Sequence, residues 1–454
     1  MKPSHSHKQT ERTGTEPLVP RRYLLTFILV TSLFALWGFA NDITNPMVAA
    51  FQTLMDLSAT KASLIQFAFY GGYATMAIPA ALFVRRFSYK KGILLGLALY
   101  AIGAFLFIPA AKWQMFSFFC ISLYVLTFGL AFLETTANPF ILSLGSRETA
   151  TRRLNLAQAF NPVGSIAGMA VASLVVLPNL LSDCRNDNGE IIYSTLSEVQ
   201  KQQVRIHDLA VIRDPYVALG IAVVVIFVII ALTKMPPVRG DGQSIHFGKS
   251  IGRLWRNKPY CFGVVAQVFY VGAQIMMWTF IIHYADNIGM NKATAQNYNI
   301  LAMSLSLTFR FVGTWAMRFI APSRLLTLFG CMATLTTLGT ILLPEGVGLG
   351  CLVATSAFMS IMFPSIYGIA LENVRPADTS LGAAFLVMAI VGGALMPPLQ
   401  GSIIDLGTLS NGFPAVKASF ALPMLCFAVV TAYGFYSTRN RIPPLQLMQG
   451  RCKR

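Results

Sequence analysis

The sequence predicts an all-α polytopic membrane protein whose twelve transmembrane helices form two pseudo-symmetric halves of six. Three observations support this prediction. Hydrophobic residues make up 55% of the 454 residues and charged residues only 12%, which is about half the charged fraction of an ordinary soluble domain. The apolar residues form long continuous runs, whereas the strands of a membrane barrel would alternate. A polar stretch in the middle of the chain separates six such runs from six more.

A transmembrane helix needs about 20 mostly apolar residues. The successive runs that meet this requirement approximately are 23–50, 62–84, 92–110, 115–143, 153–177, 216–234, 259–284, 293–317, 325–343, 348–371, 379–404 and 415–437. The stretch between the fifth and sixth runs, about 178–215, is rich in acidic residues. We interpret it as a solvated external loop.

These runs divide the chain into a polar N-terminal tail, a six-helix half, a linker, a second six-helix half and a C-terminal tail. The predicted boundaries are 1–22, 23–234, 235–258, 259–437 and 438–454. The N-terminal tail lacks the shape of a cleavable signal peptide. Two pairs of residues recur at the same spacing in the two halves: Pro139 and Pro364 are separated by the same number of residues as Gly168 and Gly393. This repetition favours a duplication of a six-helix unit.

Lysine and arginine are distributed unequally between the two sides of the predicted bundle. The side of the N-terminus carries 26 of the 35 basic residues, the other side carries 8, and Arg310 lies within a span. Because basic loops stay in the cytoplasm, we expect both termini to be cytoplasmic in a protein that spans the lipid bilayer of a bacterial inner membrane. The net charge of +17 then reflects topology and gives no support to a nucleic-acid partner.

The sequence contains no pattern typical of catalysis or of a resident cofactor. Its seven cysteines are scattered without the spacing of a metal site. We find no phosphate-binding GxxxxGK[ST] motif and no nucleophile paired with a base. We therefore expect no metal, no cofactor and no enzymatic activity. The chain is expected to act as a monomer.

Two acidic residues, Asp42 and Glu134, fall inside predicted spans once the other acids are assigned to loops. A charge at the centre of the bilayer costs about 2.5–3.5 kcal/mol on insertion scales, so acids there are usually functional. A carboxyl group that binds and releases a proton according to solvent access is what a proton-coupled carrier needs. We predict that both residues couple transport to protons. The alternative is a structural hydrogen-bonding role, or a position nearer the membrane interface.

Polar side chains are concentrated on the first, fourth, fifth and seventh spans, where they are too numerous to face lipid. The predicted substrate-binding residues are Asn41, Asn45, Glu134, Asn138, Gln158, Asn161, Gln267, Tyr270 and Gln274. Aromatic residues accompany them, namely Trp37, Tyr70, Tyr73, Trp278 and Tyr367. Amides pair with hydroxyl groups and aromatic rings cover the apolar face of a sugar, so this set suits a neutral polyhydroxy ligand. The alternative for any single amide is a hydrogen bond that joins two helices.

Arg310 is the one basic residue inside a predicted span. It has two interpretations. It could neutralise one of the buried acids, or its long side chain could extend to the cytoplasmic edge of the membrane. We favour the edge position.

Several segments together resemble the major facilitator superfamily, and more closely its fucose–galactose–glucose:proton symporter family. They include LWGFANDITNP, LIQFAFYGGYATMAIPAAL, LETTANPFILSLG, RLNLAQAFNPVGSIAG, AQVFYVGAQ and SAFMSIMFPSIYGIALEN. The resemblance implies the major facilitator fold and a carrier that alternates between outward-facing and inward-facing forms. It also implies import of a monosaccharide together with a proton.

The resemblance also assigns roles to individual residues. Glu134 matches a carboxylate of the fourth span that is tied to substrate binding and coupling, and Gln158 and Asn161 match polar residues of the fifth span. The first span departs from the family's pattern. The family's carboxylate tied to protonation falls where this chain has Asn45, and Asp42 stands about one helical turn earlier.

These observations lead us to expect a secondary active transporter that imports a monosaccharide by proton symport. The expected sugar is L-fucose or a related hexose such as galactose or glucose. Two alternatives stay open: an exporter of amphipathic drugs or metabolites, and a membrane sensor that binds sugar without moving it. Sodium also stays open as the coupling ion.

Overall fold

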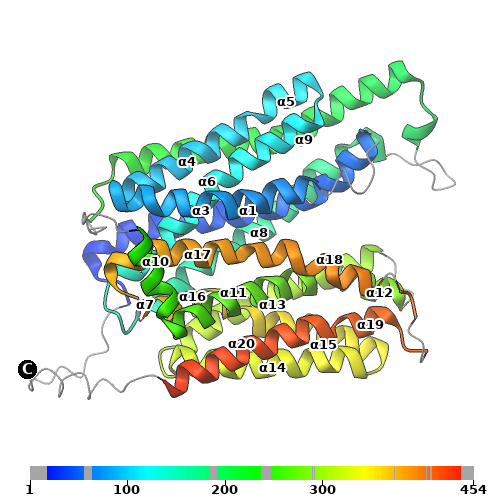
Figure 1. The fold of residues 1–454 in the computed structure, drawn as a ribbon. Coiled ribbons are helices and arrows are strands. Elements are labelled where there is room, and N and C mark those ends of the chain that lie inside the picture. Colours follow the sequence, from blue (N-terminus) through cyan, green and yellow to red (C-terminus); the bar gives the residue numbers. More distant parts are fainter. Residues whose placement is uncertain are drawn as a thin grey trace, which may run out of the picture.

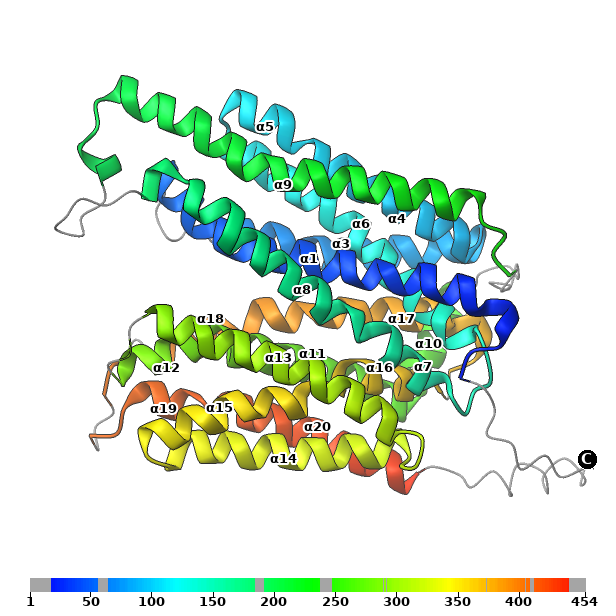
Figure 2. The ribbon, with the colours of Figure 1, turned by 180° about the vertical axis from the view of Figure 1, so that it is seen from behind.

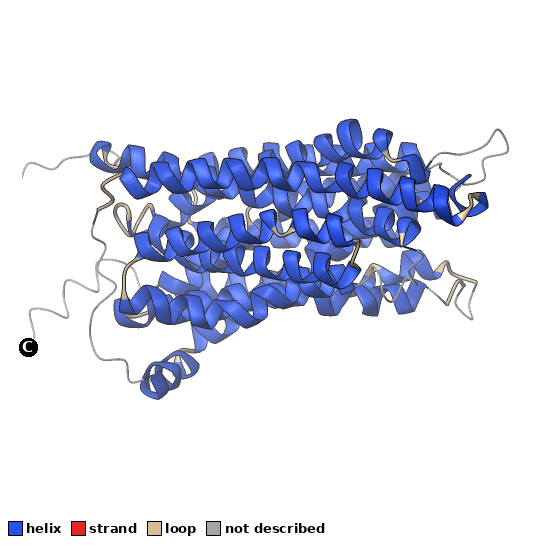
Figure 3. Cartoon of the chain, turned by 90° about the horizontal axis from the view of Figure 1, so that it is seen from above, coloured by secondary structure: helices blue, strands red, loops and turns tan. Residues whose placement is uncertain are grey.

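The computed structural model describes nearly the whole chain, and almost all of the described residues are helical (Figure 3). The described residues are 18–55, 64–183, 192–236, 247–288, 290, 292–372, 374–404, 406–408 and 412–440.

The first half of the chain forms a group of long helices (Figure 1). They are α1 (Leu24–Leu54), α3 (Leu64–Arg86), α4 (Tyr89–Phe105) with its continuation α5 (Phe107–Trp113), α6 (Phe116–Ser143), α7 (Ala150–Gln158) with α8 (Phe160–Val171), and α9 (Glu198–Leu232).

The second half forms a similar group beside it. Its helices are α10 (Phe247–Arg256), α11 (Lys258–Thr279), α12 (Ile281–Asn287), α13 (Lys292–Ala316), α14 (Pro322–Leu342), α15 (Glu345–Met359) with α16 (Met362–Glu372), α17 (Thr379–Met388) with α18 (Gly392–Ile404), and α19 (Ala415–Ser419) with α20 (Ala421–Arg439). A short 3-10 turn, η7 (Ala389–Val391), joins α17 to α18.

The helices confirm the predicted fold class. Ten helical stretches of the described chain are long and apolar enough to cross a membrane, and each overlaps one predicted span. The two other predicted spans, 62–84 and 293–317, coincide with α3 and α13, which have 23 and 25 residues.

The interpretation of 178–215 as a solvated loop is wrong over its second half, because α9 begins at Glu198. Ser197 and Gln200 form a capping box at its N-terminus, and such a box supplies partners for main-chain N–H groups that a helix start leaves free. Asp208 of the same helix is fully buried. Its carboxylate accepts hydrogen bonds from the main-chain N–H groups of Leu181 and Ser182 at 3.0 and 2.9 Å, so this segment folds back onto the helix.

Each half packs its first spanning helix against its fifth. In the first half α1 contacts α8, and in the second α11 contacts α18. Glycine makes both contacts close. A Cβ atom at Gly168 would lie 2.6 Å from the carbonyl oxygen of Phe39, and one at Gly393 would lie 3.0 Å from a side-chain carbon of Ile275. The two glycines of the predicted repeat therefore have equivalent places in the two halves.

The two halves meet along α17, which packs against α3 and α6, and along α13 and α16, which pack against α7. They lie closest at one end of the bundle and diverge toward the other (Figures 1 and 2). At the close end, α10 runs across the direction of the long helices, and we call this the α10 end. There Arg253 donates from Nε and Nη2 to the two carboxylate oxygens of Asp378 at 2.8 and 2.7 Å, and these bonds raise the pKa of Arg253.

Candidate functional site

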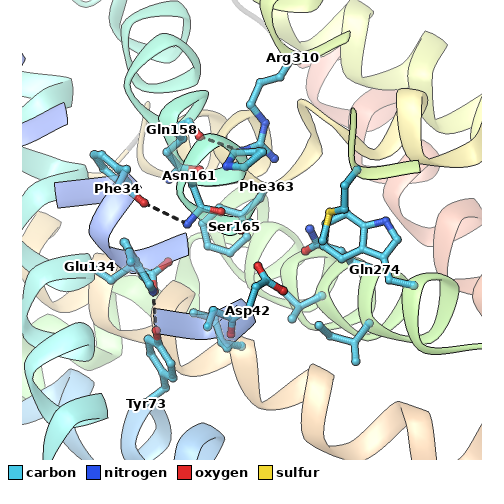
Figure 4. Close-up of a pocket in the computed structure, with 18 of the residues that line it drawn as sticks. Phe34, Asp42, Tyr73, Glu134, Gln158, Asn161, Ser165, Gln274, Arg310 and Phe363 are labelled. Atoms are coloured by element: carbon cyan, nitrogen blue, oxygen red, sulfur yellow. Dashed lines mark hydrogen bonds between the residues drawn. The ribbon is translucent and has the colours of Figure 1, made fainter. Parts of the chain in front are cut away.

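A cavity lies between the two halves and is lined by both (Figure 4). Its volume is about 130 Å³, counted as the space that the centres of water molecules can reach, which is room for several waters. The lining residues of the first half are Phe34, Trp37, Asn41, Asp42, Tyr70, Tyr73, Glu134, Gln158, Asn161, Pro162 and Ser165. Those of the second half are Val271, Gln274, Ile275, Trp278, Met303, Arg310, Phe363 and Ile390.

Both acids predicted to lie inside the membrane stand at the wall of this cavity. Glu134 of α6 is 2% exposed and Asp42 of α1 is 6% exposed. One carboxylate oxygen of Glu134, Oε2, is buried without a hydrogen-bond partner. Most buried polar atoms in folded proteins have a partner, so an unpartnered carboxylate oxygen at a cavity wall is suited to take up a proton or to bind a hydroxyl group.

Aromatic rings form one face of the cavity. Trp37 and Tyr73 are stacked with 6.4 Å between ring centroids, and the indole Nε1 of Trp37 donates to the hydroxyl of Tyr73 at 2.5 Å. Phe34 also stacks with Trp37, with 5.7 Å between ring centroids. Across the cavity, Trp278 donates from Nε1 to the hydroxyl of Ser356 at 3.2 Å. These bonds fix the rings, which can then cover the apolar face of a ligand.

Four of the predicted amide side chains line the cavity: Asn41, Gln158, Asn161 and Gln274. Asn161 donates from Nδ2 to the carbonyl oxygen of Phe34 at 3.3 Å, so its Oδ1 is left to accept from a ligand. Gln158 donates from Nε2 to Oδ1 of Asn138 at 2.9 Å. These side chains supply both donors and acceptors for hydroxyl groups.

The other predicted binding residues lie elsewhere. Asn138 is buried directly behind Gln158, which it orients. Gln267 and Tyr270 are fully buried and do not line the cavity; the hydroxyl of Tyr270 donates to the carbonyl of Met359 at 3.1 Å. Asn45 belongs to α1, but its side chain is outside the part that the structure describes.

Arg310 stands in the cavity wall, 4% exposed, so the favoured prediction of a position at the membrane edge is wrong. Its Nε donates to the carbonyl oxygen of Ser360 at 2.6 Å. Its Nη1 donates to the carbonyl oxygen of Gln158 at 2.8 Å, a bond that Figure 4 marks. Each carbonyl lies four residues before a proline, Pro364 or Pro162. Proline has no N–H for the helical bond to that carbonyl, so the guanidinium satisfies two carbonyls that the prolines leave open.

Two lining residues, Ser165 and Arg310, were absent from the predicted binding residues, although the sequence indicates a place for each of them in the site. Ser165 follows Asn161 by four residues and therefore lies on the same helix face. The two prolines, one in each half, mark carbonyls that need another donor, and Arg310 is the buried cation within reach. Met303 and Ile390 are apolar, and nothing in the sequence separates them from ordinary packing residues.

A membrane protein with two groups of helices and a carboxylate-bearing polar cavity between them has the architecture of a secondary transporter. The chain belongs to the Major Facilitator Superfamily, whose family model matches residues 24–397. This confirms the predicted resemblance, and it makes the chain a transporter and not an enzyme.

Two relatives and one solved structure show where within the superfamily its similarity lies. The chain is 58% identical to the L-fucose-proton symporter of Haemophilus influenzae, over 92% of this chain and 97% of that one. It is 34% identical to the L-fucose-proton symporter of Escherichia coli, over 92% and 94%. The crystal structure of the transporter FucP in the outward conformation superimposes with a TM-score of 0.83 at 34% identity, covering 92% of this chain and 99% of that one.

Proposed function

We propose that this chain imports a monosaccharide together with a proton, by alternating access, and that L-fucose is its preferred substrate. The observation that carries the proposal is the composition of the cavity wall. A buried carboxyl group with an unpartnered oxygen shares one cavity between the halves with four amides and a stacked aromatic face. The names of the similar symporters support the choice of a sugar and a proton.

In the proposed cycle, Glu134 carries the transported proton and Asp42 assists it. The protonated carboxyl and the amides of Gln158, Asn161 and Gln274 bind the sugar hydroxyls, and Trp37 covers the apolar face of the ring. The halves then rock about the cavity, so that it opens at the other side of the membrane. Loss of the proton to that side weakens the hydrogen bonds to the sugar and releases it. A proton gradient would thereby drive sugar accumulation.

We further propose how the chain sits in its membrane. The α10 end faces the cytoplasm, with both termini there, in the inner membrane of a bacterium. The tails and the linker keep the boundaries predicted from the sequence, with six-helix halves over 23–234 and 259–437. The form described here faces outward, because the halves are closest at the α10 end and the similar FucP structure is in an outward conformation.

A panel of radiolabelled sugars in proteoliposomes tests this function. L-fucose, D-galactose, D-glucose and an N-acetylated hexosamine are each offered with an inward proton gradient, with a sodium gradient and with no gradient. We expect L-fucose to accumulate with the proton gradient only. Accumulation that follows sodium would reject the coupling ion, and binding without counterflow would indicate a sensor. Movement of amphipathic drugs without any sugar would indicate an exporter.

A further inference from the structure

Arg310 joins the two halves of the protein through main-chain atoms. Arg310 and Ser360 belong to the second half, on α13 and at the break between α15 and α16. Gln158 belongs to the first half, at the break between α7 and α8. One guanidinium therefore bonds to an interrupted helix of its own half and to an interrupted helix of the other.

We propose that Arg310 is a clasp that holds the two halves together in the form described here, and that breaking its bond to Gln158 is a required step of the transport cycle. This inference rests on the proposed alternating-access function. It assigns Arg310 as a positioning residue, which acts through the carbonyl groups of Ser360 and Gln158.

The two bonds have different tasks in this proposal. The bond to Ser360 stays within one half, so it survives when the halves rock, and it fixes the direction of the guanidinium. The bond to Gln158 crosses between the halves, so it must lengthen when they separate at this level. A buried carbonyl that loses its donor carries a desolvation penalty, and Pro162 prevents its own helix from supplying another donor. The pair of Arg310 and Pro162 thus makes the separation costly.

The position of this bond connects it to the ligand. The side chain of Gln158 lines the cavity, while the main-chain carbonyl of the same residue accepts from Arg310. A sugar that binds the side-chain amide of Gln158 and shifts this residue also shifts its main-chain carbonyl. Ligand binding therefore acts on the clasp through a single residue.

The distance between the halves provides the test. The full chain, with its native cysteines replaced, carries spin labels at Lys112 of α5 and Glu345 of α15, which are exposed on opposite halves. Electron–electron distance measurements in nanodiscs then report the populations of the two arrangements without sugar or gradient. We expect Arg310→Met to reduce the outward-facing population relative to the inward-facing one by about tenfold, as loss of a hydrogen bond from a charged donor allows. Arg324→Met, an exposed arginine of the same half, should leave the populations unchanged.

A second set of variants distinguishes two roles of Arg310: holding the two halves together, and only supplying hydrogen-bond donors to the carbonyls of Gln158 and Ser360. Pro162→Ala and Pro364→Ala restore the N–H groups that can bond to the carbonyls of Gln158 and Ser360 within their own helices. Arg310→Met alone should lower the thermal stability, because it leaves both carbonyls without a donor. Added to Arg310→Met, the two proline substitutions should recover that stability. They should not recover the outward-facing population, because no bond between the halves is restored.

Two results would overturn the proposal. One is an unchanged distance distribution in Arg310→Met. The other is recovery of the outward-facing population together with stability in the triple variant, since Arg310 would then only satisfy carbonyl groups. Because the measurement uses no sugar and no gradient, a different substrate or coupling ion would not affect its outcome.

Discussion

The side-chain amide of Gln158 donates to Oδ1 of Asn138, with 2.9 Å between Nε2 and the oxygen. This bond joins α7 to α6 and fixes the side chain of Gln158, which lines the cavity. Asn138 is fully buried and does not touch the cavity itself. Its role is therefore to orient a residue that we propose binds the sugar.

Asn138→Ala should weaken sugar binding while leaving the maximal rate of transport nearly unchanged. A neutral hydrogen bond contributes about 0.5–1.5 kcal/mol, so KM should rise by about threefold to tenfold. Concentration-dependent uptake into proteoliposomes separates KM from the maximal rate. Asn179→Ala, which changes an exposed amide outside the cavity, is the matched control. Equal KM values for the two variants would remove Asn138 from the site.

Glu134→Gln should abolish sugar accumulation driven by a pH gradient and leave counterflow partly intact. Glutamine resembles the protonated carboxyl but never releases a proton, so the loaded form can exchange and cannot couple. Wild-type uphill uptake should fall as the outside pH rises, because fewer carboxyl groups are then protonated. Counterflow by the variant should be independent of pH.

The control for this change is Glu198→Gln, since the side chain of Glu198 is 86% exposed and does not line the cavity. It should accumulate sugar like the wild type. If Glu134→Gln also accumulates sugar normally under a pH gradient, Glu134 is not the coupling residue.

Asp42→Asn should impair proton coupling more than Asn45→Ala does. Asp42 is buried at the cavity wall and is the acidic residue of the first span, whereas Asn45 carries no ionisable group. The number of protons moved for each sugar can be measured from sugar-induced alkalinisation outside the vesicles. A larger loss in Asn45→Ala would return the first-span role to the position where the family's carboxylate falls.

The spanning helices could be predicted from the sequence because hydropathy measures the very property that a bilayer selects. The N-terminal extension of α9 could not. Residues 198–215 are polar enough to resemble a loop, and their helix depends on the capping box at Ser197 and on the long-range burial of Asp208. Neither effect appears in a hydropathy profile.

The site could be predicted in part for a similar reason. Gln267 and Gln274 are seven residues apart, two turns along one face of α11, but this spacing gives no depth, and Gln274 alone of the two reaches the cavity. The predicted position of Arg310 at the membrane edge was wrong because its partners are two main-chain carbonyls that are far apart in the sequence. These carbonyls lack a helical N–H donor only because a proline follows each of them by four residues. A single span considered alone shows neither carbonyl.

The contact between Gly368 of α16 and Thr151 of α7 leads to the last prediction. These helices belong to different halves, and a Cβ atom at Gly368 would lie 2.7 Å from the hydroxyl oxygen of Thr151. Gly368→Val should push the halves apart near the α10 end. Overpacking costs about 1–3 kcal/mol, so the outward-facing population should fall by about fivefold or more. Alkylation of a cysteine placed at Ser143, which lines a second cavity at this interface, should then become faster from the side of the α10 end, which we propose faces the cytoplasm.

Gly350→Val supplies the matched control for Gly368→Val, since a Cβ atom at Gly350 would meet nothing within 4 Å. It makes the same change in residue type within the same half, so it should leave the alkylation rate at position 143 unchanged. Equal rates in the two variants would show that the halves close without needing the space at Gly368. A faster rate in Gly368→Val alone, together with weaker binding of sugar added from outside, would show that the α10 end must be tightly packed before the cavity can accept its ligand.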